Sequence, residues 1–214
     1  MAKKKTSRNT PSKKTAKSKA SAETVLVLRT CAADMSAHGG FKWPESGPVE
    51  CPDWDPAPRC GGGLHGCVWG EGYGDLLSWD ESAKWLVVEV EASAIVELDG
   101  KVKFPRGVVV HCGTRLSATE FIQRPGRAVI GGTATAGYAG TATAGARGTA
   151  TAGARGTATA GYAGTATAGD EGIVGVRYHD GKRYRLAVGY VGEDGIEPGV
   201  QYVVADGKLV RKSP

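Results

Sequence analysis

The residues best suited to chemistry gather in one glycine-rich segment, RCGGGLHGC at positions 59–67. The thiol of Cys60 and the imidazole of His65 lie close together in sequence, and the thiol of Cys67 follows. Thiols and imidazoles act as nucleophile and base in covalent catalysis, and both ligate zinc. The glycines that allow this backbone to turn tightly or to approach a ligand closely are Gly61, Gly63 and Gly66.

The segment alone leaves four interpretations open. The glycines can form a turn that places small residues under tryptophan side chains, or a nucleotide-binding loop that lacks the usual Lys-Ser/Thr pair. Cys60 and His65 can form a nucleophile–base pair, although no protease signature surrounds them. Zinc would need Cys60, His65 and Cys67 together with Cys112 (or His111), at spacings unlike those of standard zinc sites. We expect neither a metal nor another cofactor.

An enzyme can also be assembled from more distant residues. An Arg at the end of the first predicted strand, a His-Gly pair and an acid on a later strand loosely resemble the site of ADP-ribosyltransferases. By that resemblance Arg29 would clamp phosphate and His65 would contact the ribose, while Glu89 or Glu97 would polarise the 2′-hydroxyl. The Ser-Thr-Ser strand motif of that family is absent. The sequence therefore favours a protein without catalytic residues.

Residues 25–112 contain several distinctive motifs: Arg29-Thr30, GGFKWP at 39–44, PDWDP at 52–56, CGGGLHG at 60–66 and LDGKVKFP at 98–105. On these motifs the segment resembles a family of uncharacterised bacterial and phage domains, which often carry TATAG-type octads behind them. The family has no assigned activity, so the resemblance implies an actinobacterial or phage source rather than a mechanism.

The elements that must position these residues form one small globular domain, residues 23–130. All five tryptophans of the chain fall within it, which indicates a loop-rich core filled by aromatic side chains. A short helix is expected to begin within Asp75–Ser82. Strands are predicted from β-branched and apolar runs at Thr24–Arg29, Trp85–Val90, Ala94–Glu97 and Val108–His111.

Five octads follow, GTATAGYA, GTATAGAR, GTATAGAR, GTATAGYA and GTATAGDE, at residues 132–171. Because side chains alternate along a strand, the threonines of each TATA face one side and the alanines the other. A four-residue strand and a glycine-flanked corner predict a flattened β-solenoid with two octads per coil, assigned to residues 131–171. With two octads per coil, Tyr138 and Tyr162 belong on opposite edges.

The octads resemble the repeats of bacterial ice-nucleation proteins, on the text AGYAGTATAG at 136–145 and 160–169. The resemblance implies a flat threonine array that orders water. The chain departs from that family in having few repeats, so a rigid spacer or stacking surface is also predicted. The array consists of Thr133, Thr135, Thr141, Thr143, Thr149, Thr151, Thr157, Thr159, Thr165 and Thr167.

Residues 172–214 return to ordinary strands, expected at Ile173–Tyr178, Arg183–Val191 and Gln201–Val204, with a hairpin turn at Asp180-Gly181. This segment is predicted to cap the open end of the solenoid. The expected fold class is therefore mainly β, with a tryptophan-rich α+β head, a short solenoid and an antiparallel β cap.

Residues 1–22 form a basic, polar tail predicted to be disordered. The first twenty residues hold eight Lys or Arg and no acid, so a formal net charge of +5 leaves −3 for the rest. Such a tail contacts nucleic acid or another polyanion weakly and without sequence preference. Its candidate contacts are Lys3, Lys4, Lys5, Arg8, Lys13 and Lys14.

Other bounds concern location and partners. No signal-like or membrane-spanning apolar run is recognised, so a cytoplasmic protein without membrane contact is expected. Five cysteines form an odd set, which favours free thiols. The overall prediction is a non-enzymatic structural or interaction protein, with self-association through the solenoid as one route.

Overall fold

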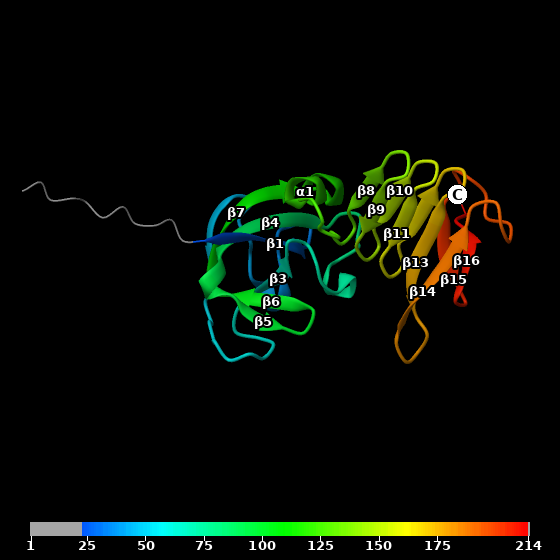
Figure 1. Ribbon diagram of the computed structural model, residues 1–214. Helices are drawn as coiled ribbons and strands as arrows, with labels where there is room; N and C mark the ends of the chain where they lie inside the picture. Colours follow the sequence, from blue (N-terminus) through cyan, green and yellow to red (C-terminus); the bar gives the residue numbers. More distant parts are fainter. Residues whose placement is uncertain (1–22, 214) are drawn as a thin grey trace, which may run out of the picture.

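The computed structural model describes residues 23–213, so the candidate tail contacts lie outside the described residues. Strands dominate this part of the chain and form three sheets, accompanied by a single α-helix (Figure 1). The predicted mainly β fold is therefore confirmed. We call residues 23–130 the head, the strands β8 to β13 the solenoid, and residues 180–213 the cap.

The head is built on one antiparallel sheet in the order β2-β7-β4-β1-β3-β6-β5. The central strands β1 and β4 pair along their whole length, and Val27 and Leu28 on adjacent positions are both fully buried, one on each face. The strands are β1 Thr24–Cys31, β2 Gly47–Glu50, β3 Leu64–Val68, β4 Lys84–Glu91, β5 Val96–Leu98, β6 Lys101–Phe104 and β7 Arg106–Gly113.

The helix of the head lies elsewhere than predicted. The stretch Asp75–Ser82 contains only the end of a 3-10 turn, Gly74–Leu76, because Asp80 Oδ1 accepts from the backbone N–H of Ser82 and so draws the chain out of helical hydrogen bonding. The α-helix is α1, Arg115–Ile122, which begins where the Thr114 side chain accepts from Ser117 N. A second 3-10 turn, Ala92–Ala94, delays β5 beyond its predicted start. A third, His38–Gly40, lies in the loop after β1.

The octads form parallel strands that alternate between two sheets. β8 pairs with β10 and β10 with β12, while β9 pairs with β11 and β11 with β13, each in register. This is the predicted two-octad coil. Its interior is alanine, and Ala150, Ala158 and Ala166 are fully buried. The strands are β8 Thr133–Ala136, β9 Thr141–Ala144, β10 Thr149–Ala152, β11 Thr157–Ala160, β12 Thr165–Ala168 and β13 Ile173–His179.

The corners of the coil confirm that Tyr138 and Tyr162 lie on opposite edges. Arg155 Nη1 donates to the hydroxyl of Tyr138 at 3.0 Å on one edge, and Arg147 N donates to the carbonyl of Tyr162 at 2.8 Å on the other. Arg147 and Arg155 themselves adopt left-handed φ values of 53° and 56°, which the tight corner requires.

The two ends of the solenoid meet different parts of the chain (Figure 1). On the head side, Gly145 N donates to Val129 O at 3.2 Å and Gly131 N donates to Ala146 O at 2.8 Å. On the other side, β14 pairs with β13, and β15 pairs with β12 through Ala166 and Tyr202. The strands of the cap are β14 Tyr184–Tyr190, β15 Tyr202–Ala205 and β16 Lys208–Arg211.

Candidate functional site

The head contains a cavity of about 830 Å³ at the point where β1 and β3 separate. The two strands pair only through Val27 with Val68 and Leu28 with Cys67. Gly66 allows this closeness, because a Cβ there would lie 2.7 Å from the carbonyl oxygen of Leu28. Beyond that contact β1 and β3 no longer pair. The sequence candidates that line the cavity are Arg29, Cys60, Gly61, Gly63, His65, Gly66 and Cys67.

Arg29 provides a half-buried positive charge in this cavity. Its guanidinium lies 4.0 Å from the ring centroid of Trp43, donates to Thr30 O at 2.8 Å and reaches His65 O at 3.5 Å. Burial lowers the pKa of Arg29 to about 10, so the group remains protonated at neutral pH. Among residues 23–213 it has no carboxylate within ion-pair distance.

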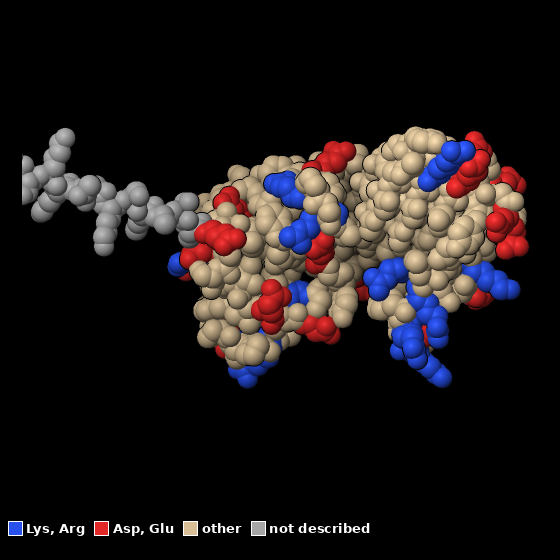
Figure 2. All heavy atoms as spheres, in the orientation of Figure 1, with Lys and Arg blue, Asp and Glu red and all other residues tan. Residues whose placement is uncertain are grey.

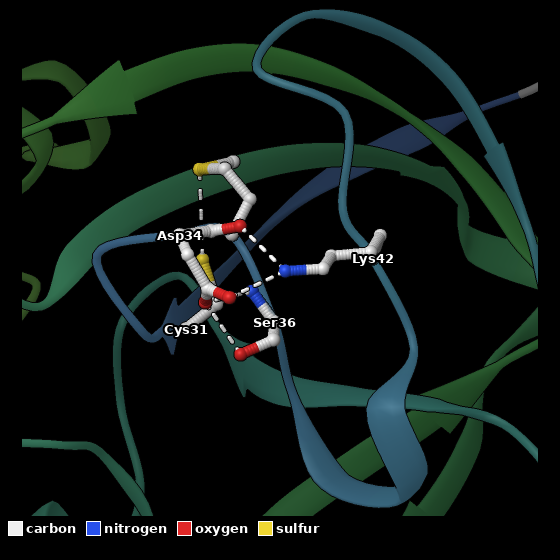
Figure 3. A network of polar contacts seen from close by, with 5 residues as sticks. Cys31, Asp34, Ser36 and Lys42 are labelled. Atoms are coloured by element: carbon white, nitrogen blue, oxygen red, sulfur yellow. Dashed lines mark hydrogen bonds and ion pairs between the residues drawn. The ribbon is translucent and has the colours of Figure 1, made fainter.

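The loop after β1 supplies the aromatic wall of the cavity, Phe41 and Trp43. Figure 3 shows how this loop is tied: Asp34 accepts from the backbone N–H of Ser36 at 3.0 Å and pairs with the Lys42 ammonium. The hydrogen bonds from Lys42 and Ser36 hold the pKa of the Asp34 carboxyl well below its usual range. These contacts therefore tie together the two arms of the loop that carries the aromatic residues.

The thiol and imidazole of the glycine-rich segment have different surroundings. Cys60 is exposed, and Lys101 Nζ donates to its sulfur at 3.2 Å, which lowers the pKa of the thiol. Burial, followed by the nearby charge of Lys101, lowers the pKa of His65. The Nε2 atom of His65 is buried without a hydrogen-bond partner among the described residues.

A buried lysine, which the sequence analysis did not single out, holds the glycine-rich segment in place. Lys103 is fully buried on β6, and its Nζ donates to Arg59 O at 2.9 Å and Gly61 O at 3.1 Å. Gly63 packs beside Trp54, since a Cβ there would lie 3.1 Å from that ring. Lys103 could have been found from its place between the apolar residues Val102 and Phe104, because a charge that is buried there must find partners inside the protein.

Two other predicted groupings do not form. Glu89 and Glu97 do not line the cavity, because Glu89 lies on β4 beside Leu26 of β1, and Glu97 is exposed on β5. The enzyme-like grouping with Arg29 and His65 is therefore not assembled, and Asp53 is the one carboxylate among the cavity residues.

The predicted zinc set is also not assembled. No three His, Cys, Asp or Glu side chains within residues 23–213 gather as metal ligands, so Cys60, His65, Cys67 and Cys112 do not form the ligand set, although the first three line one cavity. Burial raises the pKa of Cys67 to about 11, which keeps this thiol protonated. All five cysteines are free, as the odd number predicted.

The threonine array is divided between the two outer walls of the solenoid. One wall carries the threonines of β8, β10 and β12, and the other those of β9 and β11. The solvent-exposed fraction of the threonines falls toward the cap. Thr133 and Thr135 are exposed, whereas Thr165 and Thr167 are only 6% and 9% exposed. Figure 2 shows few charged side chains over the octads, in contrast to the Lys and Arg gathered near the β13–β14 hairpin.

Comparisons with known proteins give two kinds of match. Residues 25–124 match the model of a domain of unknown function, DUF7666. Over 100 residues the chain is 47% identical to the ice nucleation protein InaU of Pantoea ananas, an alignment covering 46% of this chain and 10% of that protein. Over 99 residues it is 48% identical to an ice nucleation protein of Pseudomonas syringae, covering 45% of this chain and 9% of that protein.

These relatives bear on two predictions. A relationship of the chain to ice nucleation proteins is supported, although the chain spans only about a tenth of the length of those proteins. An actinobacterial or phage source is not supported, because the matched organisms are Pantoea, Enterobacter, Pseudomonas and Xanthomonas.

No solved structure matches the chain. Within the described residues, no helix has the length and apolar character to span a membrane.

Proposed function

We propose that this chain is a non-enzymatic interaction protein whose solenoid presents threonines that order water and adsorb to ice. The observation that carries the proposal is the in-register stacking of Thr-x-Thr pairs, with Thr149 beside Thr133 and Thr165, and Thr151 beside Thr135 and Thr167. Parallel strands stack about 4.8 Å apart, and alternate residues along a strand recur about every 6.6 Å. The threonines therefore form a two-dimensional lattice.

The chemistry of this lattice suits ordered water. Threonine is stiff at χ1, so neighbouring hydroxyl and methyl groups keep fixed positions. The outer walls are formed by uncharged threonine side chains. The backbone groups of the paired strands are used in the two parallel ladders. Hydrogen bonds through a water that bridges fixed hydroxyl groups are nearly as favourable in enthalpy as direct hydrogen bonds.

The similarity to ice nucleation proteins supports the same role for this chain, on a smaller scale. The accessible part of the array is two octads deep on each wall, since the threonines of β12 are buried. We therefore expect adsorption to an existing ice surface rather than strong nucleation of new ice.

The test is partition of the full chain into slowly growing ice. A double variant, Thr141→Lys with Thr143→Lys, places two charges on the exposed strand β9 and leaves the other wall intact. A second variant, Thr133→Lys with Thr135→Lys, does the same on β8. The matched control is Thr24→Lys, at an exposed position that begins β1 in the head.

Wild type and the Thr24→Lys control should enter the ice, and each double variant should enter several-fold less. Circular dichroism must show that the double variants keep the β structure of wild type. If wild-type protein stays in the liquid, or if the double variants enter as wild type does, the proposal is wrong.

A further inference from the structure

Two buried nitrogen atoms without partners point to a ligand in the head. Among residues 23–213, the buried side-chain nitrogen and oxygen atoms that lack a hydrogen-bond partner are Trp43 Nε1 and His65 Nε2. Both residues line the same cavity between β1 and β3. A buried polar group without a partner costs about 1–3 kcal/mol, and these two unsatisfied nitrogen atoms both belong to residues that line one cavity.

The charges around the cavity select the sign of the ligand. Arg29 and Lys101 line it, and Asp53 is its one acidic residue. Arg29 is paired only with backbone carbonyls, and Asp53 accepts from the Cys51 thiol at 2.9 Å. A half-buried guanidinium with no carboxylate partner favours an oxyanion, which accepts hydrogen bonds from guanidinium, ammonium and indole N–H groups alike.

The remaining walls of the cavity are apolar and suit a ligand whose uncharged part is apolar. Phe41 packs edge-on against Trp43, with ring centroids 5.6 Å apart, and Leu76 and Leu77 close another side. Pockets for small organic molecules have this composition, mostly apolar with a few convergent polar groups, and a volume of 300–1,000 Å³ is usual. A cavity of about 830 Å³ lies within that range.

We propose that the head binds a small organic anion, with its oxyanion held by Arg29 and Lys101 and its apolar part against Phe41 and Trp43. This binding is independent of the threonine array. It gives a role to the glycine-rich segment, whose Gly61–Gly63 backbone Lys103 holds at the rim of the cavity.

The probe for this class of ligand is 8-anilinonaphthalene-1-sulfonate, titrated into the full chain and followed by its fluorescence. We expect one site per chain, and affinity about tenfold weaker in Lys101→Met, because one charge-assisted contact is lost. The matched control is Lys84→Met, a lysine of the head that does not line the cavity. The uncharged N-phenyl-1-naphthylamine should bind wild type and Lys101→Met equally.

Two further measurements locate the dye. An exposed apolar strip on β14 is the competing surface, so Leu186→Asp should leave the affinity unchanged. Saturating dye should slow alkylation of Cys60 by iodoacetamide, because the anion competes for Lys101. Arg29→Met should abolish binding, provided that its unfolding transition remains cooperative.

The proposal is overturned if the dye does not bind, or if Lys101→Met binds as wild type does. Loss of binding in Leu186→Asp, with Cys60 unprotected, would place the dye on β14 and also overturn it. Neither result would affect the threonine array, so this proposal and the ice-adsorption proposal fail separately.

Discussion

Arg147 of the second octad lies over the ring of Trp79, with 4.9 Å between its guanidinium carbon and the ring centroid. The same guanidinium reaches Asp75 Oδ1 at 3.4 Å. Both partners belong to the head, so this one corner residue joins the solenoid to the head. The guanidinium of the equivalent residue of the third octad, Arg155, instead donates to two other corner residues, Tyr138 and Glu171.

Replacing Arg147 should therefore loosen the junction. Arg147→Ala removes a cation–π contact of about 0.5–1 kcal/mol and an exposed ion pair of smaller value. Hydrogen exchange should accelerate at the Gly131 and Gly145 amides, which donate across the junction. Arg155→Ala is the matched control and should leave those two amides unchanged. Equal acceleration in both variants would show that Arg147 does not act locally.

Two glycines at the same octad position should respond in opposite ways to alanine. A Cβ on Gly161 would lie 2.5 Å from the backbone of the coil below, at Ala146 N, whereas a Cβ on Gly137 would meet no atom within 4 Å. Gly161→Ala should lower the free energy of unfolding by about 1–3 kcal/mol through overpacking. Gly137→Ala should be neutral, or stabilising by up to about 1 kcal/mol.

Urea titration of both variants, followed by circular dichroism, measures this difference. The comparison controls for the chemistry of the substitution, since both are glycine-to-alanine changes at the same octad position, although the two corners lie on opposite edges of the coil. A similar loss of unfolding free energy in both variants would mean that backbone propensity, and not contact between coils, explains why glycine occupies these positions.

The repetitive part of the chain could be predicted from sequence further than the head could. An eight-residue period with threonine and alanine alternating leaves few ways to bury alanine and to close corners, so coil size and edges followed directly. The head lacks such a period. The sequence analysis did not predict the strand β3, which carries His65, because its one glycine and its histidine hide the apolar alternation.

Parts of the cavity could also be anticipated, but its complete set of residues could not. Arg29 and His65 were singled out by residue type, and both line it. Lys101 reaches the cavity because β6 pairs with β3, and Trp43 reaches it from the loop after β1. The local spacing of residues does not predict either relationship. Glu89 does not line the cavity and neither does any other residue of β4, which the sequence does not show.

His65 should make the stability of the protein depend on pH. Burial lowers its folded pKa below the unfolded value of about 6.5, so between these two values the unfolded chain binds more protons. Stability contributed by neutral His65 is present above about pH 6.5 and is lost as pH falls toward the folded pKa. His65→Gln should flatten the decline in unfolding free energy between pH 6.5 and pH 5.

Asp34→Asn is the control for this titration. The pKa of Asp34 is lowered by Lys42 and Ser36, so its contribution is lost only as pH falls below about 4. This variant should therefore keep the wild-type slope between pH 6.5 and pH 5. An unchanged slope in His65→Gln would show that His65 does not control stability in this range.

Cys60 should be the most reactive thiol of the chain. It is exposed and receives a hydrogen bond from Lys101 that lowers its pKa, whereas Cys31, Cys51 and Cys67 are buried with raised pKa values. Because the thiolate is the nucleophile, iodoacetamide at pH 7.5 should alkylate Cys60 first. Lys101→Met should slow that reaction severalfold, since it removes the cation that stabilises the thiolate.

Peptide mass analysis after timed alkylation assigns the modified residue, and the pH dependence of the rate reports the pKa. The midpoint of the rate profile should move to higher pH in Lys101→Met and stay in place in Lys84→Met. If the two variants behave alike, the 3.2 Å contact between Lys101 and Cys60 does not control the thiol. If Cys112 reacts first, the thiol of this partly buried residue, and not that of the exposed Cys60, is the most reactive in the chain.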